Sequence, residues 1–422
     1  MNNPHDHHGT GNHSHGRPGS RAALTLISLA HSINHGQSAL KPLVYPLVLR
    51  ELGFGYAELG IMLGVASAVG GLLQFVAGAL GRLIKRHLLL GLGNASVGIC
   101  FFLVALAQSF PQFFVWTVMS RVGGAAQHPV GSALLSHHFQ RKQLGTALAA
   151  HFTAGNIGTA LIPLFAAVLI SLWGWRVTTI LFAIPAVIIG LAMCAFLQDP
   201  RETGETGNRP KASIWQDSRF AIQNSNLRWI LLAAVVAAGG SGHGVVSTFL
   251  PLYLSHNLGM ETPTVGVVFT VLMIGSIAGP LLGGRLADRF HPQKVLLGAY
   301  AMAALTTILF PWAGTNIVSI SIAALVLGAS AFGTHPILQT MVVQVTDDRT
   351  RDMGFAWFYT ATFMAGAIWS PAVGYIAELL GLTAVFGAMA ASFVLASVCV
   401  LLGQLHAIPQ THLSTSDSWS HG

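Results

Sequence analysis

The sequence predicts an all-α polytopic membrane protein, with twelve transmembrane helices in two pseudo-symmetric six-helix bundles. Three observations predict this fold class. Of the 422 residues, 53% are hydrophobic and only 8% are charged, whereas about 25% are charged in soluble domains. Apolar runs of about 20 residues, the length that crosses a bilayer, recur along the chain. Landmarks of the first half also return in the second half at a near-constant spacing. A water-soluble fold is therefore excluded.

The apolar runs define the expected helices and the domain organisation. They lie near residues 22–49, 57–80, 88–108, 111–135, 144–171, 175–197, 229–254, 264–284, 295–314, 316–343, 354–380 and 383–404. The run that begins at residue 22 is too long for the apolar part of a cleaved signal peptide, so we expect the N-terminus to be retained. The predicted domains are a disordered, histidine-rich cytoplasmic tail (1–21), an N-terminal bundle (22–197), a cytoplasmic linker (198–228), a C-terminal bundle (229–404) and a cytoplasmic tail (405–422).

The distribution of Lys and Arg predicts the orientation. With the N-terminus in the cytoplasm, 17 of the 21 Lys and Arg residues lie in inner loops and tails, and only Arg50 and Arg176 lie outside. This bias follows the positive-inside rule and predicts both termini in the cytoplasm, with the chain in the inner (plasma) membrane. It also explains the pI of about 9.7 without a basic surface for nucleic acid, so we expect no nucleic-acid partner.

The two halves of the chain repeat each other. Gln127-His128-Pro129 matches Thr334-His335-Pro336 at an offset of 207, and Gly174 matches Gly381 at the same offset. Pro163 and Pro371 lie 208 residues apart. Duplicated bundles are typical of secondary transporters, whose substrate site lies between the halves near the middle of the bilayer.

A loop between the eighth and ninth runs carries a recognisable motif. Gly284-Arg285-Leu286-Ala287-Asp288-Arg289-Phe290, followed by Lys294, resembles the cytoplasmic loop motif of the major facilitator superfamily. The resemblance implies that Gly284, Asp288 and Arg289 form a conformational latch between the bundles. The alternative is an ordinary positively charged inner loop. The expected first copy, residues 78–86, is degenerate, because Arg82 stands where the second copy has Asp288.

Three further motifs in the N-terminal half suggest a narrower group. His31-Ser32-Ile33-Asn34-His35 with Ser38, Pro42 and Pro46, then Gln127-His128-Pro129, then Gly155-Asn156-Ile157-Gly158 with Pro163, resemble the pattern of fosmidomycin-resistance-type exporters. That resemblance implies efflux of a small, often anionic, drug or metabolite in exchange for protons. Two acidic residues of the pattern are absent here, because His35 and Val130 stand in their places.

The resemblance also implies which polar residues line the pathway of substrate and protons. The first, fourth, seventh and tenth helices surround the cavity in such transporters. The candidates are His31, Asn34, His35, Lys41, Arg121, Gln127, His128, His243 and His335 on these helices, with Asn156 on the fifth. Histidines titrate near neutral pH, so they can carry protons or bind anions within a membrane. The alternative for each histidine is a hydrogen bond to a neighbouring helix.

Arg121 is the costliest of these candidates. An arginine at the centre of a spanning helix costs about 2.5–3.5 kcal/mol on insertion scales and stays charged. Its partner is a helix-terminal carbonyl, a residue of another span, or a substrate anion. Lys41 would strengthen an anion-binding cavity, or else extend its amine to the outer interface.

Neither a metal site within the spans nor a cofactor is expected. The three cysteines lack metal-ligand spacing, and the tail histidines His5, His7, His8, His13 and His15 are only weak metal candidates. Motifs for ATP binding or zinc hydrolysis are absent, so we expect no enzyme. The leading interpretation is a monomeric, proton-coupled exporter of a small organic compound. An importer of an organic or inorganic anion and a metal-ion exporter are the alternatives.

Overall fold

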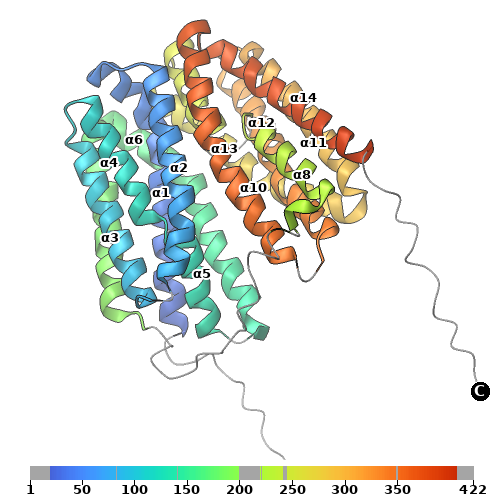
Figure 1. Cartoon of the computed structure of the whole chain (residues 1–422). Helices are drawn as coiled ribbons and strands as arrows, with labels where there is room; N and C mark the ends of the chain where they lie inside the picture. Colours follow the sequence, from blue (N-terminus) through green and yellow to red (C-terminus); the bar gives the residue numbers. More distant parts are fainter. Residues whose placement is uncertain are drawn as a thin grey trace, which may run out of the picture.

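The protein is described by a computed structural model (Figure 1) that covers residues 20–81, 83–139, 141–198, 219, 221–240, 245–347 and 350–405. Every regular element in these ranges is helical. The elements are α1 (Ser20–Leu52), α2 (Tyr56–Leu80), α3 (Arg86–Ala105), α4 (Phe110–Gly124), α5 (Gln127–His138), α6 (Arg141–Phe196), α8 (Ser225–Ala237), α9 (Val245–Leu252), η2 (Tyr253–Asn257), α10 (Thr262–Arg289), α11 (Pro292–Leu309), η3 (Phe310–Trp312), α12 (Ile317–Val345), α13 (Arg351–Leu380) and α14 (Leu382–Leu405).

Several predicted spans are joined or divided differently in the helices of the structure. Eight helices in the described ranges are long and apolar enough to cross a membrane. One of them, α6, contains the fifth and sixth predicted spans, separated by a kink at Gly174, whose φ is 76°. The fourth predicted span is divided into α4 and α5 by a turn at residues 125 and 126. The all-α membrane fold is thus confirmed, while the number twelve stays a prediction.

The helices form two groups that follow the two halves of the sequence. Figure 1 shows α1 to α6 packed together in one group and α8 to α14 in the other. In the first, α6 packs along α1 and α3; in the second, α10 packs along α12, and α14 packs along α11 and α8. Gly174 and Gly381 both have positive φ, 76° and 83°, a conformation that only glycine adopts readily. The same backbone break at both positions supports the predicted duplication.

The two halves meet most closely where α2 lies against α13. A Cβ added at Gly374 would lie 2.5 Å from the carbonyl oxygen of Tyr56 and 2.9 Å from the Cα of Gly60. A Cβ added at Gly64 would lie 2.7 Å from Cγ of Pro371. Small residues allow helix backbones to approach closely inside a membrane. These glycines therefore set the distance between the halves.

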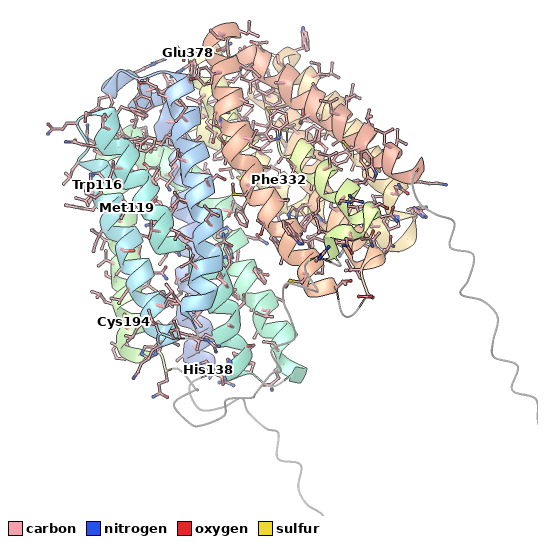
Figure 2. The ribbon with its side chains drawn as sticks, in the orientation of Figure 1. Trp116, Met119, His138, Cys194, Phe332 and Glu378 are labelled. Atoms are coloured by element: carbon pink, nitrogen blue, oxygen red, sulfur yellow. The ribbon has the colours of Figure 1, made fainter. Side chains whose placement is uncertain are left out.

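Polar contacts join the halves at one end of this interface. A side-chain oxygen of Glu378, on α13, accepts a hydrogen bond of 2.7 Å from the backbone N–H of Tyr56, the first residue of α2. His256 of η2 contacts the hydroxyl of Tyr56 at 2.7 Å and the carbonyl oxygen of Pro46 at 3.1 Å. Figure 2 labels Glu378 at the end where the two groups lie together. On the predicted orientation this is the outer end.

The halves diverge toward the opposite end, where Figure 2 labels His138. Asp288 and Arg289, two of the predicted latch residues, lie at that end of α10 with exposed side chains. Neither forms an ion pair with another residue in the described ranges. The halves are therefore joined at the predicted outer end and apart at the predicted cytoplasmic end, and the latch stays a prediction for another conformation.

The contact of His256 predicts a pH dependence of the outer closure. Burial lowers the pKa of His256 from its usual 6.5, and the charge of Arg50 lowers it further, whereas the hydrogen bond that Nε2 donates to the carbonyl oxygen of Pro46 raises it. A lowered pKa in the folded state means that the contact is fully stabilising above pH 6.5 and weakens as the pH falls through the lowered value. Acidification of the outer side should therefore loosen this end.

Spin labels at Leu106 and Leu380, which are exposed on opposite halves, would measure this loosening. The distance between the labels should stay constant above the usual histidine pKa of about 6.5 and lengthen as the pH falls below it. His256→Gln should remove most of the change, whereas Glu378→Gln should leave its pH dependence in place. An identical distance distribution above and below that pKa in the wild type would contradict the prediction.

Candidate functional site

A network of side-chain amides ties three helices of the first half together. The amide of Asn34 on α1 donates to Asn94 Oδ1 on α3 at 2.7 Å, and Asn94 donates to Gln127 Oε1 on α5 at 3.1 Å. Asn94 and Gln127 are buried. Buried polar groups with full hydrogen bonding rigidify the structure around them. Two of the predicted site residues, Asn34 and Gln127, thus position helices beside the neighbouring histidines.

Next to this network the structure gathers three of the predicted histidines. His31 and His35, one helical turn apart, share a face of α1, and His128 comes from α5. A ring nitrogen of each lies within 4.8 Å of a ring nitrogen of each of the others. The ring of His31 lies edge-on to those of His35 and His128, with centroids 4.4 and 5.2 Å away. We call His31, His35 and His128 the imidazole cluster.

Sequence reasoning missed a fourth histidine, His151 on α6. Its ring stacks on His31 with centroids 4.2 Å apart, and its backbone carbonyl oxygen lies 3.0 Å from Nδ1 of His31. A Cβ at Gly155, one turn further along α6, would lie 2.8 Å from the His31 ring, so this glycine leaves room for the imidazole. The spacing of four residues between His151 and Gly155 was the available signal, because both residues share one helix face.

Two cations form a second group in the same half. The Lys41 ammonium donates to Ser120 Oγ at 3.4 Å and lies 4.9 Å from the centre of the Phe101 ring. Arg121 follows Ser120 on α4, and its side chain is exposed. Neither Lys41 nor Arg121 forms an ion pair with a described residue. Lys41 therefore points inward between helices and not toward an interface, and the pair creates a positive field without a nearby carboxylate.

The structure does not bring the remaining candidates into contact with the imidazole cluster within the described residues. His335, on α12 in the other half, contacts the side-chain amide of Gln339 at 3.3 Å and the ring of Phe358 at 5.1 Å between centroids. Asn156 on α6 has an exposed side chain. His243 and the tail histidines fall outside the described residues. The repeat-related residues His128 and His335 therefore contact different kinds of neighbour in the structure.

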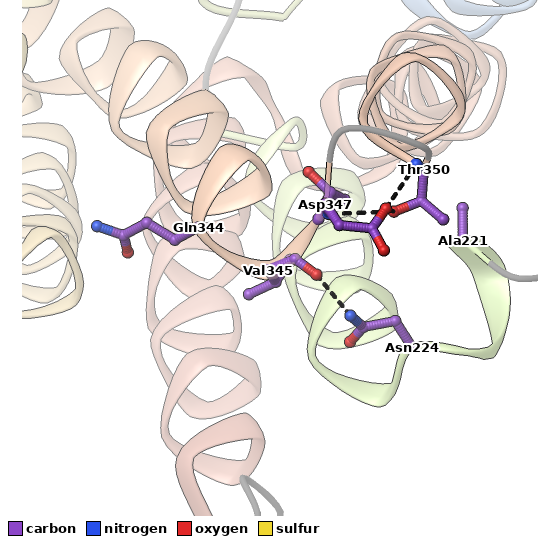
Figure 3. Close-up of a pocket in the computed structure, with 7 residues that line it drawn as sticks. Ala221, Asn224, Gln344, Val345, Asp347 and Thr350 are labelled. Carbon is purple, nitrogen blue, oxygen red and sulfur yellow. Dashed lines mark hydrogen bonds between the residues drawn. The ribbon is translucent and has the colours of Figure 1, made fainter. Parts of the chain in front are cut away.

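A pocket of about 460 Å³ lies elsewhere, beside the end of α12 and the residues before α8. Figure 3 shows hydrogen bonds between Asn224 and Val345 and between Asp347 and Thr350. Asn224 donates to the carbonyl oxygen of Val345 at 2.6 Å, and Thr350 donates to a carboxylate oxygen of Asp347. Since these groups satisfy each other and none of the predicted site residues is present, the candidate site remains in the first half.

A family comparison agrees with this architecture. The family model of the Major Facilitator Superfamily matches residues 27–260 and 230–418. The chain belongs to this superfamily. The resemblance inferred from residues 284–290 is thereby confirmed, and the chain is a multi-pass membrane protein related to transporters. The narrower resemblance to fosmidomycin-resistance-type exporters stays a prediction.

Individual relatives of this superfamily member are distant but cover most of the chain. Multidrug resistance protein MdtG of Escherichia fergusonii is 25% identical over 85% of this chain and 86% of its own length. A probable 4-methylmuconolactone transporter of Cupriavidus pinatubonensis is 24% identical over 87% and 85%. A probable L-galactonate transporter of Escherichia coli is 22% identical over 81% and 80%.

Solved structures confirm the superfamily fold. The nucleoside transporter NupG matches with a TM-score of 0.76 at 11% identity, over 92% of this chain and 99% of its own. A bacterial homologue of the lysosomal transporter Spinster, solved in an inward-facing and occupied conformation, matches with a TM-score of 0.73 at 14% identity, over 92% and 97%. At these identities the likeness concerns the fold alone.

Proposed function

We propose that the protein exports a small organic anion across the inner (plasma) membrane in exchange for protons, by alternating access. The observation that supports an anionic substrate is the pair of cations around Ser120. Lys41 contacts Ser120 Oγ, Arg121 is the next residue, and no described carboxylate pairs with either. An unneutralised positive field in a low-dielectric region attracts negative solutes.

The geometry of the two halves supports alternating access. They are joined at the end of Glu378 and Tyr56 and diverge at the end of His138. This arrangement corresponds to one of the two states between which paired bundles move as rigid bodies around a central site. The names of two relatives, a probable L-galactonate transporter and a probable 4-methylmuconolactone transporter, favour an organic acid or a related compound as substrate. The name of the MdtG relatives favours export.

Everted membrane vesicles test the direction and the coupling together. In everted vesicles prepared from a strain that overproduces the protein, acidification of the lumen should drive labelled organic acids such as galactonate to accumulate inside the vesicles. Dissipation of the proton gradient with nigericin should abolish it. Vesicles from the strain without the protein provide the control.

Two outcomes would contradict the proposal. Uptake of the anion by intact cells, without accumulation in everted vesicles, would establish the anion importer instead. Export that is confined to cationic compounds across a panel of matched acids, neutral compounds and amines would remove the anion as substrate. Growth of the overproducing strain on the same panel adds a resistance readout.

A further inference from the structure

The imidazole cluster has a geometry that anion export does not require. His31, His35 and His128 come from two helices of the first half, and they form the one group of at least three potential metal-ligating side chains among the described residues. His31 is buried, His35 is half-buried and His128 is exposed. The cluster therefore begins inside the bundle and opens to its surface.

We propose that His31, His35 and His128 bind one divalent transition-metal ion of the class of Zn²⁺. A ring nitrogen from each already lies within 4.8 Å of the others. An ion bound at about 2.0–2.1 Å from each nitrogen would hold them roughly 3.3 Å apart, so small side-chain rotations complete the site. The inference goes beyond the proposed function and does not depend on it.

Hydrogen bonds at the far side of two rings prepare them as ligands. Nδ1 of His31 lies 3.0 Å from the carbonyl oxygen of His151, an acceptor, so Nδ1 carries the proton and Nε2 carries the lone pair in the neutral ring. Metal-ligating histidines almost always make such a second bond, which fixes the tautomer and the ring orientation.

Thr159 fixes the tautomer of His35 in the same way. The hydroxyl of Thr159 donates its proton to the carbonyl oxygen of Gly155 at 3.1 Å, so it accepts from Nδ1 of His35 at 2.9 Å. In the neutral ring the lone pair of His35 is then on Nε2. Two rings of the cluster thus present the same nitrogen, and each is oriented by an acceptor on α6.

Unsatisfied nitrogens beside the cluster point to a ligand. Nε2 of His31 and both ring nitrogens of His151 are buried and have no hydrogen-bond partner within the part of the chain that the structure describes. Buried polar groups without a protein partner are rare and call for an explanation such as an ion or ordered water. An ion on Nε2 of His31 satisfies the first of these nitrogens directly.

The donor set selects the class of ion. Three neutral imidazoles suit Zn²⁺, Ni²⁺, Co²⁺ and Cu²⁺, whereas Mg²⁺ and Ca²⁺ prefer oxygen ligands. Three protein ligands leave a fourth position of a tetrahedral ion for water or an exchangeable group. Because the His128 side chain is exposed, the ion can enter and leave through that position.

Metal titration of the full-length protein tests the site. The tail histidines are first replaced by Asn (His5, His7, His8, His13 and His15), so that the tail contributes no binding, and purification uses a tag without histidine. Calorimetry with Zn²⁺ should show one ion per chain. Co²⁺ should give the visible absorption of a four-coordinate ion, and Zn²⁺ should displace it.

Variants in that tail-substituted background identify the ligands. His128→Asn, at an exposed position, should abolish the Co²⁺ absorption and weaken Zn²⁺ binding at least about tenfold. Thr159→Val should weaken it by about 10- to 100-fold, the usual effect of losing a hydrogen bond to a metal-ligating histidine. His335→Asn, in the other half, is the matched control and should leave affinity and stoichiometry unchanged.

The outcomes are decisive because binding is measured without transport. The proposal would be overturned if the tail-substituted protein bound no Zn²⁺ or Co²⁺. It would also be overturned if His128→Asn and Thr159→Val both bound the ion with the affinity of the tail-substituted parent. Both variants are compared only as monodisperse protein of unchanged melting temperature, and Thr159→Val keeps the test valid if His128→Asn fails to fold. Failure of anion export would leave these results unaffected.

Discussion

Replacement of Arg121 by Gln should strongly reduce anion transport while the amount of protein in the membrane stays near the wild-type level. The Arg121 side chain is exposed on α4 and has no ion-pair partner among the described residues, so its removal leaves no buried charge behind. A hydrogen bond to a charged group contributes about 1.5–3 kcal/mol, so loss of the guanidinium should lower the transport rate at low substrate by about 10- to 150-fold. Initial rates in vesicles, normalised to immunoblotted protein, measure the effect.

Arg121→Lys separates charge from geometry. A lysine keeps the positive field but lacks the planar, two-pronged donor set of arginine, so partial activity would show that charge dominates. Ser136→Ala, at an exposed position elsewhere in the first half, is a control for handling and expression. Transport by Arg121→Gln at the wild-type rate would remove this residue from the mechanism, and loss of the variant from the membrane would indicate a packing role.

Introduction of a leucine at Gly374 should force the outer end open and reduce transport at least about tenfold. A Cβ at this position would already lie 2.5 Å from the carbonyl oxygen of Tyr56, and overpacking of this kind costs about 1–3 kcal/mol. Since the strain exists only while α2 and α13 are in contact, it should shift the population toward the open state by about 5- to 150-fold. Labels at Leu106 and Leu380 should then report a longer distance.

The control is Gly387→Leu on α14, where an added Cβ meets nothing within 4 Å. It should change neither the label distance nor the transport rate. If Gly374→Leu does not accumulate in the membrane, Gly374→Ala provides a smaller version of the same clash. A label distance in either Gly374 variant that equals the wild-type value would show that these glycines do not determine the closure.

Much of the fold follows from local signals in the sequence. The apolar runs predicted the helices because a bilayer requires continuous helical hydrogen bonding. The break between α4 and α5 also has a signal in the sequence, although residues 111–135 were predicted to form one span. Gly123 and Gly124 weaken the helix there, and Pro129 cannot donate to the carbonyl of Ala125.

The candidate site depended on information that no single helix carries. His31 and His35 were predictable as neighbours because they are four residues apart on α1. Their contacts with His128 and His151 require that α5 and α6 pack on α1, and a glycine at position 155 allows it. The position of Lys41 was equally non-local, since its contacts come from Phe101 on α3 and Ser120 on α4.

The bond from the start of α2 to Glu378 gives the chain a way to adjust its resting state independently of its specificity. The carboxylate of one half meets the N-terminus of a helix in the other, an interaction with the helix dipole that contributes typically about 0.3–1 kcal/mol at an exposed position and is screened by salt. Even 1 kcal/mol changes the ratio of two conformers by about fivefold. Substitutions at this one surface position could thus tune how long the transporter dwells in each state, and external ionic strength would act on the same balance, with no change to the residues that select the cargo.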